Sequence, residues 1–327
     1  MTDLSTEYMG LTLKNPIVIG SSSLTNTVEK IKRLEEAGAG AVVLKSLFEE
    51  QIRAEKGALE HDTALFTHPE AYEYIDKMSM ELGPESYLKL IKDAKESVSI
   101  PVIASLNCTS SRWWIDYAKK IELAGADALE LNISFTPGDF RKSSVEIENL
   151  YFDIFEKVKR HIDLPVAVKV GPFFTNFGSV AAEFCKRGTS ALVLFNRFYQ
   201  FDIDINRLEI SGGIRMSSPQ EMEQSLRWIS LLSGKIMCDL AASTGIFDAA
   251  GVIKQLLAGA KVVEIVSTLF INGIDNVKVI LKDIEKWMTD HKFTSIDQFR
   301  GKLNQLESEN PEMYERLQYI KAIVGVE

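Results

Sequence analysis

Short apolar runs recur along the chain, separated by segments of helical periodicity. Continuous rather than alternating apolar runs are typical of parallel strands that are buried on both faces. Eight such strands, each followed by helical sequence, are what a closed (β/α)8 TIM barrel needs. The eight runs are residues 17–20, 41–44, 102–105, 128–131, 167–170, 191–194, 236–240 and 262–265.

Glycine corners support this division into strands and helices. Gly38, Gly125, Gly188 and Gly259 each end a helical pattern directly before an apolar run. Glycine is favoured there because a helix commonly closes with one residue in the left-handed conformation.

Two helix starts are also predicted by capping patterns. Asn26 is followed three residues later by Glu29, and Ser218 is followed by Pro219 and Glu221. Both patterns are typical of a first helical turn, and proline suits its first position.

Two connections are longer than a barrel requires. Residues 48–87 follow the second strand, and residues 197–217 follow the sixth, with apolar and polar alternation at 201–205. Long connections in compact domains are usually lids or binding loops, so we expect functional insertions after strands 2 and 6. The tail from residue 290 carries two helical stretches, and we expect residues 1–327 to form a single barrel domain with a C-terminal helical tail.

Composition narrows the class of protein. The chain has 327 residues, 46% of them hydrophobic, and a formal net charge of −9. This charge argues against a nucleic-acid surface, which needs a basic face. The first residues lack the pattern of a signal peptide and no apolar segment is long enough to span a membrane, so we expect a soluble cytoplasmic protein without membrane partners.

Cysteine spacing indicates neither a disulfide framework nor a zinc site. Cys108, Cys185 and Cys238 are odd in number and widely separated. We therefore expect no disulfide and no bound metal.

The fourth apolar run leads directly into polar side chains. Asn132 and Ser134 follow it, at the carboxyl end of a predicted strand. Active sites of (β/α)8 barrels lie at that face, so we expect both side chains to point into a site. The alternative is that Asn132 only caps a turn.

Two lysines stand at predicted strand ends. Lys45 follows the second strand and Lys169 lies at the end of the fifth. A lysine in so apolar a context is costly unless its charge has a partner. The alternative is a lysine whose head group reaches solvent.

The ends of strands 7 and 8 are suited to bind a phosphate. Thr244 and Gly245 precede a helix that is predicted to open at residues 247–248, and Ser267 and Thr268 follow the eighth strand. Backbone N–H groups at a helix start favour phosphate, and barrels often bind phosphate at this place. The alternative for the first pair is an ordinary helix cap.

Arg197 is a candidate for binding an anionic substrate. It follows Asn196 at the end of the sixth strand, where its guanidinium could bind a carboxylate with two hydrogen bonds. The alternative is a surface arginine on the long connection.

The order of these motifs resembles the dihydroorotate dehydrogenase family, especially its soluble class 1, over nearly the whole chain. The motifs that carry the resemblance are Asn15-Pro16, Lys45-Ser46, residues 130–134, Val168-Lys169, Asn196, residues 211–214, Gly245-Ile246 and residues 297–303. The resemblance implies an FMN-binding barrel, prone to form homodimers, that oxidises dihydroorotate to orotate. The hydride passes to the flavin while a Cys or Ser on a mobile loop removes a proton.

The resemblance also implies roles for individual residues. It places Lys45 beside flavin and substrate and Lys169 at the N1 region of the flavin, where a cation would stabilise the charge of the reduced ring. Asn132 and Asn196 match asparagines that contact both molecules. The other residues that it implies for the cofactor are Ser21, Ser22, Ser46, Gly212, Gly213, Thr244, Gly245, Ser267 and Thr268. The absence of a Gly-x-Gly-x-x-Gly motif agrees with FMN rather than a dinucleotide.

The substrate loop departs from the family pattern. Phe135 stands where the family has its Cys or Ser base, and Pro137 stands where it has a second asparagine. We therefore expect an FMN-dependent oxidoreductase that takes a hydride from a small anionic substrate, for which a pyrimidine is one candidate.

Three alternatives remain open at this point. One is a true dihydroorotate dehydrogenase of pyrimidine biosynthesis that uses another base, such as Thr136. The second is a flavin-binding protein without turnover. The third is a Schiff-base lyase or aldolase that uses Lys169.

Overall fold

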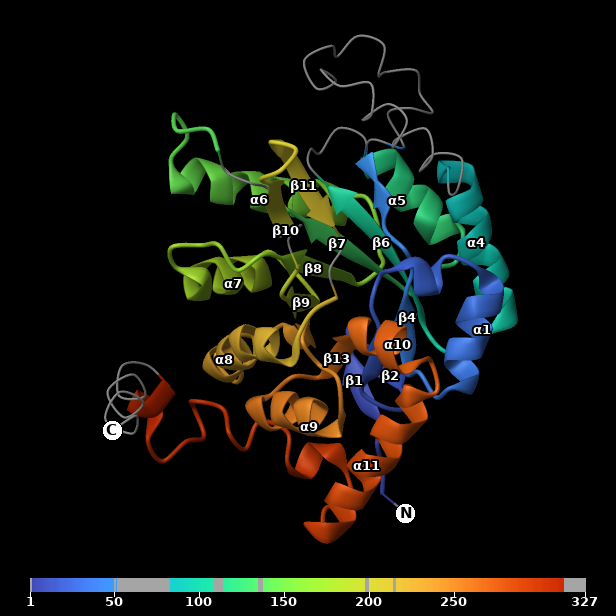
Figure 1. Cartoon of the computed structure of the whole chain (residues 1–327), viewed down its shortest axis with the longest axis vertical. Coiled ribbons are helices and arrows are strands. Elements are labelled where there is room, and N and C mark those ends of the chain that lie inside the picture. The colour runs from blue at the N-terminus through green and yellow to red at the C-terminus, as the bar shows by residue number, and fades with distance from the viewer. Residues whose placement is uncertain are drawn as a thin grey trace.

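The computed structural model describes residues 2–49, 51, 83–108, 114–134, 138–197, 200–213 and 216–314. Eight parallel strands form a closed barrel, in which β4 pairs with β6 to complete the ring (Figure 1). The strands are β3 (Ile17–Ile19), β4 (Ala41–Val43), β6 (Val102–Cys108), β7 (Ala128–Ile133), β8 (Val166–Val170), β9 (Ala191–Leu194), β12 (Asp239–Ser243) and β13 (Val262–Ile265). The predicted (β/α)8 fold is confirmed.

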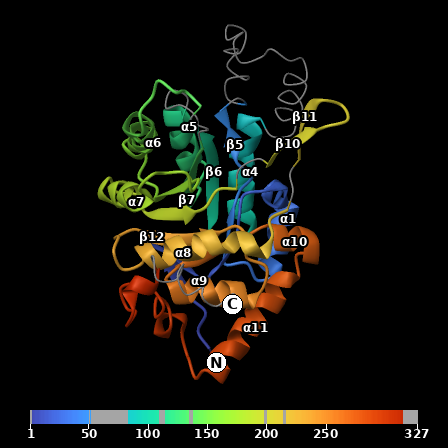
Figure 2. The ribbon, with the colours of Figure 1, turned by 60° about the vertical axis from the view of Figure 1, so that its left-hand side comes forward.

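Helices surround the strands, and α8 and α9 lie side by side on the outside of the barrel (Figure 2). They are α1 (Val28–Glu36), α4 (Pro84–Ser97), α5 (Trp114–Leu123), α6 (Ser144–Lys159), α7 (Phe177–Lys186), α8 (Met222–Leu232), α9 (Ala249–Ala258), α10 (Ser267–Asn272) and α11 (Asn276–Asp290), together with short 3-10 helices η1 (Ser23–Thr25), η3 (Pro219–Glu221), η4 (Ile296–Gln298) and η5 (Pro311–Tyr314). None of the helices in the described ranges is both long and apolar enough to cross a membrane.

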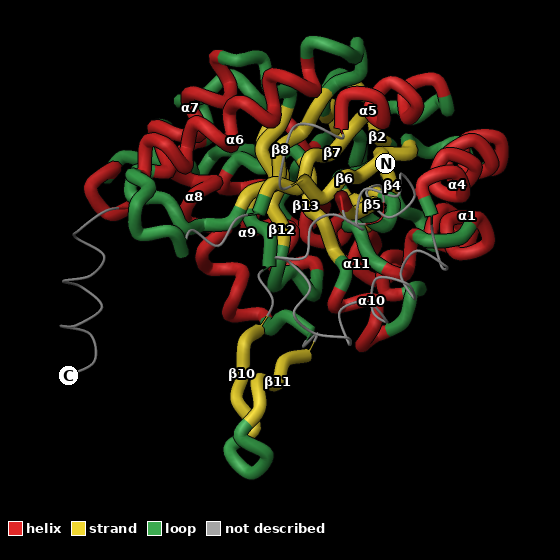
Figure 3. Tube along the Cα trace, turned by 90° about the horizontal axis from the view of Figure 1, so that it is seen from above, coloured by secondary structure: helices red, strands yellow, loops and turns green. Residues whose placement is uncertain are grey.

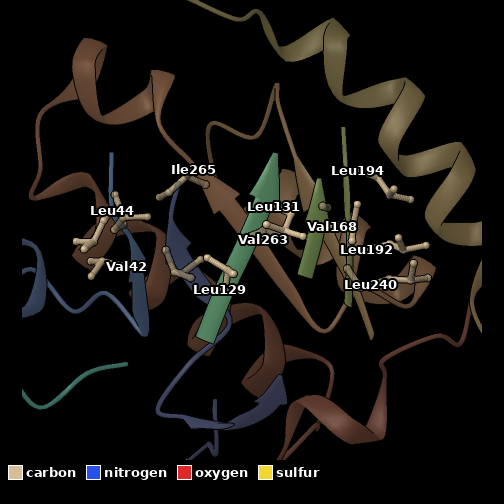
Figure 4. Packing of buried hydrophobic residues seen from close by; sticks show 14 of the residues in the cluster. Val42, Leu44, Leu129, Leu131, Val168, Leu192, Leu194, Leu240, Val263 and Ile265 are labelled. Atoms are coloured by element: carbon tan, nitrogen blue, oxygen red, sulfur yellow. The ribbon is translucent and has the colours of Figure 1, made fainter. Parts of the chain in front are cut away.

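Alternate strand positions divide the apolar residues into two layers. The outward positions share one buried cluster with helix residues, and Figure 4 shows Leu129, Leu131, Val168, Leu192 and Val263 among its strand members. The positions between them form a second cluster, and because successive strand residues point to opposite faces, this cluster fills the barrel interior. Its strand members are Val18, Ala41, Val43, Ile103, Ala128, Ala167, Ala191, Val193, Ala241 and Val262.

A β-hairpin closes the amino-terminal end of the barrel. Strands β1 (Thr6–Tyr8) and β2 (Leu11–Leu13) pair antiparallel. Tyr8, Met9 and Leu13 belong to the interior cluster, and the N–H of Met9 donates to Oδ2 of Asp239 at 2.8 Å. The interior is therefore packed with apolar side chains from this end upward.

The seventh strand was predicted three residues too early. Residues 236–238 are apolar, but β12 begins at Asp239, and Met237 is 97% exposed. The strand is made largely of small residues, which a search for large apolar side chains overlooks. The position of this strand therefore follows the space inside the barrel rather than the hydrophobicity of the sequence.

Helix ends agree with the glycine corners, but one predicted cap is wrong. Gly38 and Gly259 have φ of +103° and +116°, in the left-handed region. Helix α1 is capped by Thr27, whose hydroxyl accepts from the N–H of Lys30, while Oδ1 of Asn26 accepts from Lys30 Nζ. The start at Ser218 and Pro219 is confirmed: Pro219 opens η3, and the N–H of Ser218 donates to Glu221 at 2.7 Å.

The predicted insertion after the sixth strand is a hairpin that projects from the barrel (Figure 3). Strand β10 (Gln200–Asp204) pairs with β11 (Glu209–Gly213), in agreement with the alternation seen in the sequence. Of the insertion after the second strand, residues 52–82 lie outside the described part; before them, β5 (Leu47–Phe48) pairs with β6.

A disulfide joins Cys185 and Cys238, whose Cα atoms lie 5.4 Å apart, so the prediction of no disulfide was wrong. Cys185 lies in α7, which leads into β9, and Cys238 directly precedes β12. Because β9 and β12 are neighbours in the sheet, the fold brings together two cysteines that are 53 residues apart. Sequence spacing alone does not show such proximity.

Candidate functional site

The inward-facing positions change from apolar to polar toward the carboxyl ends of the strands. Each polar residue stands two positions after a member of the interior cluster and therefore points the same way. We call this set the polar ring; it consists of Ser105, Glu130, Lys169, Ser243 and Glu264, all of them buried. The ring lies on an apolar floor, at the face where barrel enzymes place their sites.

Lys169 is held inside the barrel by two carboxylates. Its Nζ donates to Oε2 of Glu264 at 2.5 Å and lies 3.7 Å from Oε1 of Glu130. Burial disfavours its charge, but Glu130 and Glu264 together raise the pKa of Lys169 above its ordinary value. The expectation of a charge partner is confirmed. The alternative, a lysine whose head group reaches solvent, is wrong, since Lys169 is only 8% exposed.

Glu130 is the less well paired of the two carboxyls. Burial, followed by the negative charge of Glu264, raises the pKa of Glu130 well above its ordinary value, while Lys169 acts in the opposite direction. Its Oε1 is buried without a hydrogen-bond partner. The neutral form of Glu130 is therefore favoured.

Sequence reasoning missed the functional importance of Glu264. The signal was the same one that singled out Lys169, because Glu264 is a charged residue within the apolar run at 262–265. A buried charge is costly without a partner. Three such charges on strands of one barrel therefore predict that they meet inside it.

Asn132 and Asn196 meet at the rim. Nδ2 of Asn196, which follows β9, donates to Oδ1 of Asn132 at the end of β7 at 2.9 Å. Asn132 stands opposite Lys169 in the register of β7 and β8. Ser134 follows β7 directly and is half-buried.

A chain of hydroxyl groups links three strand ends. The Oγ atoms of Ser21 and Ser46 lie 3.0 Å apart, and those of Ser46 and Ser105 lie 2.8 Å apart. This joins the segment after Lys45 to the polar ring. Ser22 is used locally, since its Oγ accepts from the N–H of Leu24 and caps η1.

The loops after β9, β12 and β13 meet at a second group of hydroxyls. Oγ of Ser217 donates to Oγ of Ser267 at 2.9 Å, and the N–H of Gly245 donates to Ser217 Oγ at 3.4 Å. Thr244 and Gly245 both have positive φ, +75° and +77°. Thr268 is fully buried, and its hydroxyl donates to the carbonyl of Phe247.

The remaining candidates lie farther from the polar ring. Gly212 and Gly213 belong to β11 of the projecting hairpin. Phe135, Thr136 and Pro137 lie outside the described residues, so the substitution of the family base remains a fact of the sequence.

A pocket of about 590 Å³ opens beside the rim. Its lining includes Asn196, Arg197, Ser243 and Thr244, and α8 contributes Trp228. Nε of Arg197 donates to Oε2 of Glu221 at 2.7 Å, so a carboxylate of the protein already binds this guanidinium. The volume is sufficient for a small molecule.

Fold and site together define a barrel protein whose candidate ligand site lies at the carboxyl ends of its strands. The chain belongs to the dihydroorotate dehydrogenase family, whose model matches residues 3–288. The family resemblance found in the motifs is thus confirmed.

The similarity to known relatives extends over almost the full length of both proteins. The chain is 26% identical to the dihydroorotate dehydrogenase B (NAD(+)) catalytic subunit of Thermoplasma acidophilum over 92% of this chain and 99% of that protein. The proteins of the same name from Pyrococcus furiosus and Methanocella arvoryzae are 28% and 29% identical, over 90% and 89% of this chain and 97% and 95% of theirs.

Proposed function

We propose that this protein is an FMN-dependent oxidoreductase that takes a hydride from a small anionic substrate. The observation that carries the proposal is the polar ring, where Lys169 lies inside the barrel next to the Asn132–Asn196 pair. Membership of the dihydroorotate dehydrogenase family and the names of the relatives support the same reaction class.

The donor groups of the site fit FMN. Lys169 and the amides of Asn132 and Asn196 are donors of the kind that bind ring nitrogens and carbonyl oxygens of a flavin. The hydroxyls of Ser217 and Ser267 with the backbone at Thr244 and Gly245 supply small groups for a phosphate. When bound, FMN supplies the hydride acceptor; the protein binds and orients it.

The proposal includes the other candidates of the sequence. Lys45 and Ser46 would lie near both ligands, with Ser21 holding Ser46. Thr268 and Ser22 would support the loops rather than touch the cofactor, because their hydroxyls bond within the protein.

A Schiff-base lyase is not proposed. A lysine forms a Schiff base as a neutral amine. The two carboxylates around Lys169 raise its pKa and keep it charged.

The test begins with purified protein incubated with FMN. Ultrafiltration and mass spectrometry of the retained flavin decide whether FMN is bound, and anaerobic addition of dihydroorotate shows whether that substrate reduces it. FAD as the only retained species, or no retention of any flavin, would contradict the proposal.

We also propose that the protein forms a homodimer through the hairpin. Ile205, Leu208 and Ile210 of the projecting hairpin are 78%, 85% and 75% exposed. Exposed aliphatic side chains gathered on one element mark an interaction surface. Light scattering should give the dimer mass for the wild type and the monomer mass for Ile205→Glu/Leu208→Glu, while Met237→Glu stays dimeric; a wild type that is monomeric at all concentrations would exclude this interface.

A further inference from the structure

Three charged side chains from three strands meet inside the barrel: Lys169 of β8, Glu130 of β7 and Glu264 of β13. Directly beneath them lie Ala128, Ala167 and Val262, each fully or almost fully buried. The group therefore rests on a floor of buried apolar side chains. We call these three charged residues the buried triad.

The buried triad contains one cation and two carboxyl groups. Among the described residues, Tyr8 of β1 and Tyr87 of α4 also interact electrostatically with its carboxyl groups. Burial raises the pKa of both tyrosines, so neither brings a charge. One lysine cannot neutralise two ionised carboxylates in so deeply buried an environment.

Geometry shows which carboxyl group is the neutral one. Glu264 accepts the 2.5 Å hydrogen bond from Lys169, which is the contact of an ionised acceptor with a cation. Oε1 of Glu130 lies 3.7 Å from the same Nζ and has no hydrogen-bond partner, although it is fully buried. An ionised oxygen would not remain in such surroundings.

We propose that Glu130 holds a proton at neutral pH and that Glu264 is the positioning residue for Lys169, so that the buried triad carries no net charge. This inference rests on the proposed function for its consequence. Lys169 would meet the flavin as an oriented hydrogen-bond donor whose charge Glu264 already balances. Because Glu130 would be protonated, its carboxyl group would not compete with the flavin for that donor.

The proton is tested in the protein without flavin. Difference infrared spectroscopy at neutral pH should show the carbonyl band of a protonated carboxylic acid in the wild type. Glu130→Gln should lose this band, whereas the control Glu36→Gln, at an exposed glutamate of α1, should keep it. A wild type without the band, or a Glu130→Gln variant that retains it, would overturn the assignment.

The positioning role is tested by FMN binding. Glu130→Gln should bind FMN within about twofold of the wild type, because glutamine resembles the protonated acid in shape and charge. Glu264→Gln should bind about tenfold or more weakly, since a charge-assisted hydrogen bond orients Lys169.

The infrared spectrum of Glu264→Gln separates positioning from a general structural role. In Glu264→Gln, Lys169 has only Glu130 as a partner, so Glu130 should ionise and the infrared band should vanish in that variant as well. FMN affinity unchanged in Glu264→Gln would overturn the positioning role. Failure of the wild type to bind FMN would instead overturn the proposed function, and the infrared result would still decide the proton assignment.

Discussion

Lys169 and Glu264 form a hydrogen bond of 2.5 Å across the inside of the barrel, although they are 95 residues apart. Their strands β8 and β13 are not neighbours, since β9 and β12 lie between them in the sheet. The bond thus ties together two sides of the barrel above its apolar floor.

Replacing Lys169 should therefore destabilise the fold. Lys169→Met leaves Glu130 and Glu264 without a cation, and breaking a buried pair by removing one partner typically costs about 3–5 kcal/mol. Urea denaturation measures this loss, and Lys169→Met/Glu264→Gln should recover most of it. A single variant as stable as the wild type would show that both carboxyls are already neutral.

The same lysine should affect the flavin. Lys169→Ala is expected to weaken FMN binding or lower its reduction potential, because a donor that stabilises the reduced ring is lost. A redox titration of the reconstituted protein gives the potential. Lys45→Ala should act more on turnover than on flavin retention; a Lys45 variant that loses FMN while the Lys169 variant retains it would reverse the two roles.

Glu130 should make stability fall as pH rises. Its pKa is raised in the folded protein, so its contribution to stability is fully present below the unfolded value of about 4.3 and is lost as pH rises through the folded value. Within that window the unfolded chain releases a proton that the folded protein keeps, which costs up to about 1.4 kcal/mol per pH unit.

Glu130→Gln removes this dependence. The difference in unfolding free energy between wild type and Glu130→Gln should decline across the window and be constant below it. Denaturation at a series of pH values checks this, with Glu36→Gln as control. A difference that grows with pH would mean that Glu130 is ionised in the folded state.

Strand periodicity predicted the barrel, because eight continuous apolar runs leave few other arrangements. It placed the seventh strand three residues too early, because β12 is made largely of small residues such as Ala241 and Ala242. The site was predicted in part: the cost of burying Lys169 required a partner, yet the identity of that partner depends on which strands face each other. The Cys185–Cys238 pair was missed for the same reason.

Arg197 should contribute to binding an anionic ligand at the rim. Arg197→Lys keeps the charge but loses the two-pronged geometry, so orotate should bind about tenfold more weakly. Glu221 holds the guanidinium in this structure, and Glu221→Gln should strengthen orotate binding by releasing it. Calorimetric titration measures both, with Arg160→Lys, in an ion pair with Glu156 outside this pocket, as control. Equal affinities in all variants would place Arg197 among structural ion pairs.

Phe135 should limit the oxidation of dihydroorotate. Removing two hydrogens from carbon needs a proton acceptor as well as a hydride acceptor, and a positioned base typically contributes about 10²–10⁴-fold. We expect dihydroorotate to reduce bound FMN very slowly, while dithionite reduces it readily, and Phe135→Cys to recover part of the rate. Stopped-flow absorbance under nitrogen measures this. Rapid bleaching by dihydroorotate in the wild type would show that another group, such as Thr136, is the base.

Because the polar ring lies on the apolar floor, the candidate ligand-binding residues and the residues that stabilise the fold occupy different levels along the barrel axis. Each residue of the polar ring follows a floor residue by two positions on the same strand, so a change at Ser105, Ser243 or Asn132 alters what the upper face accepts without replacing any residue of the packed layer below. A mutant library confined to those three positions would sample new substrates while the apolar floor stays unchanged.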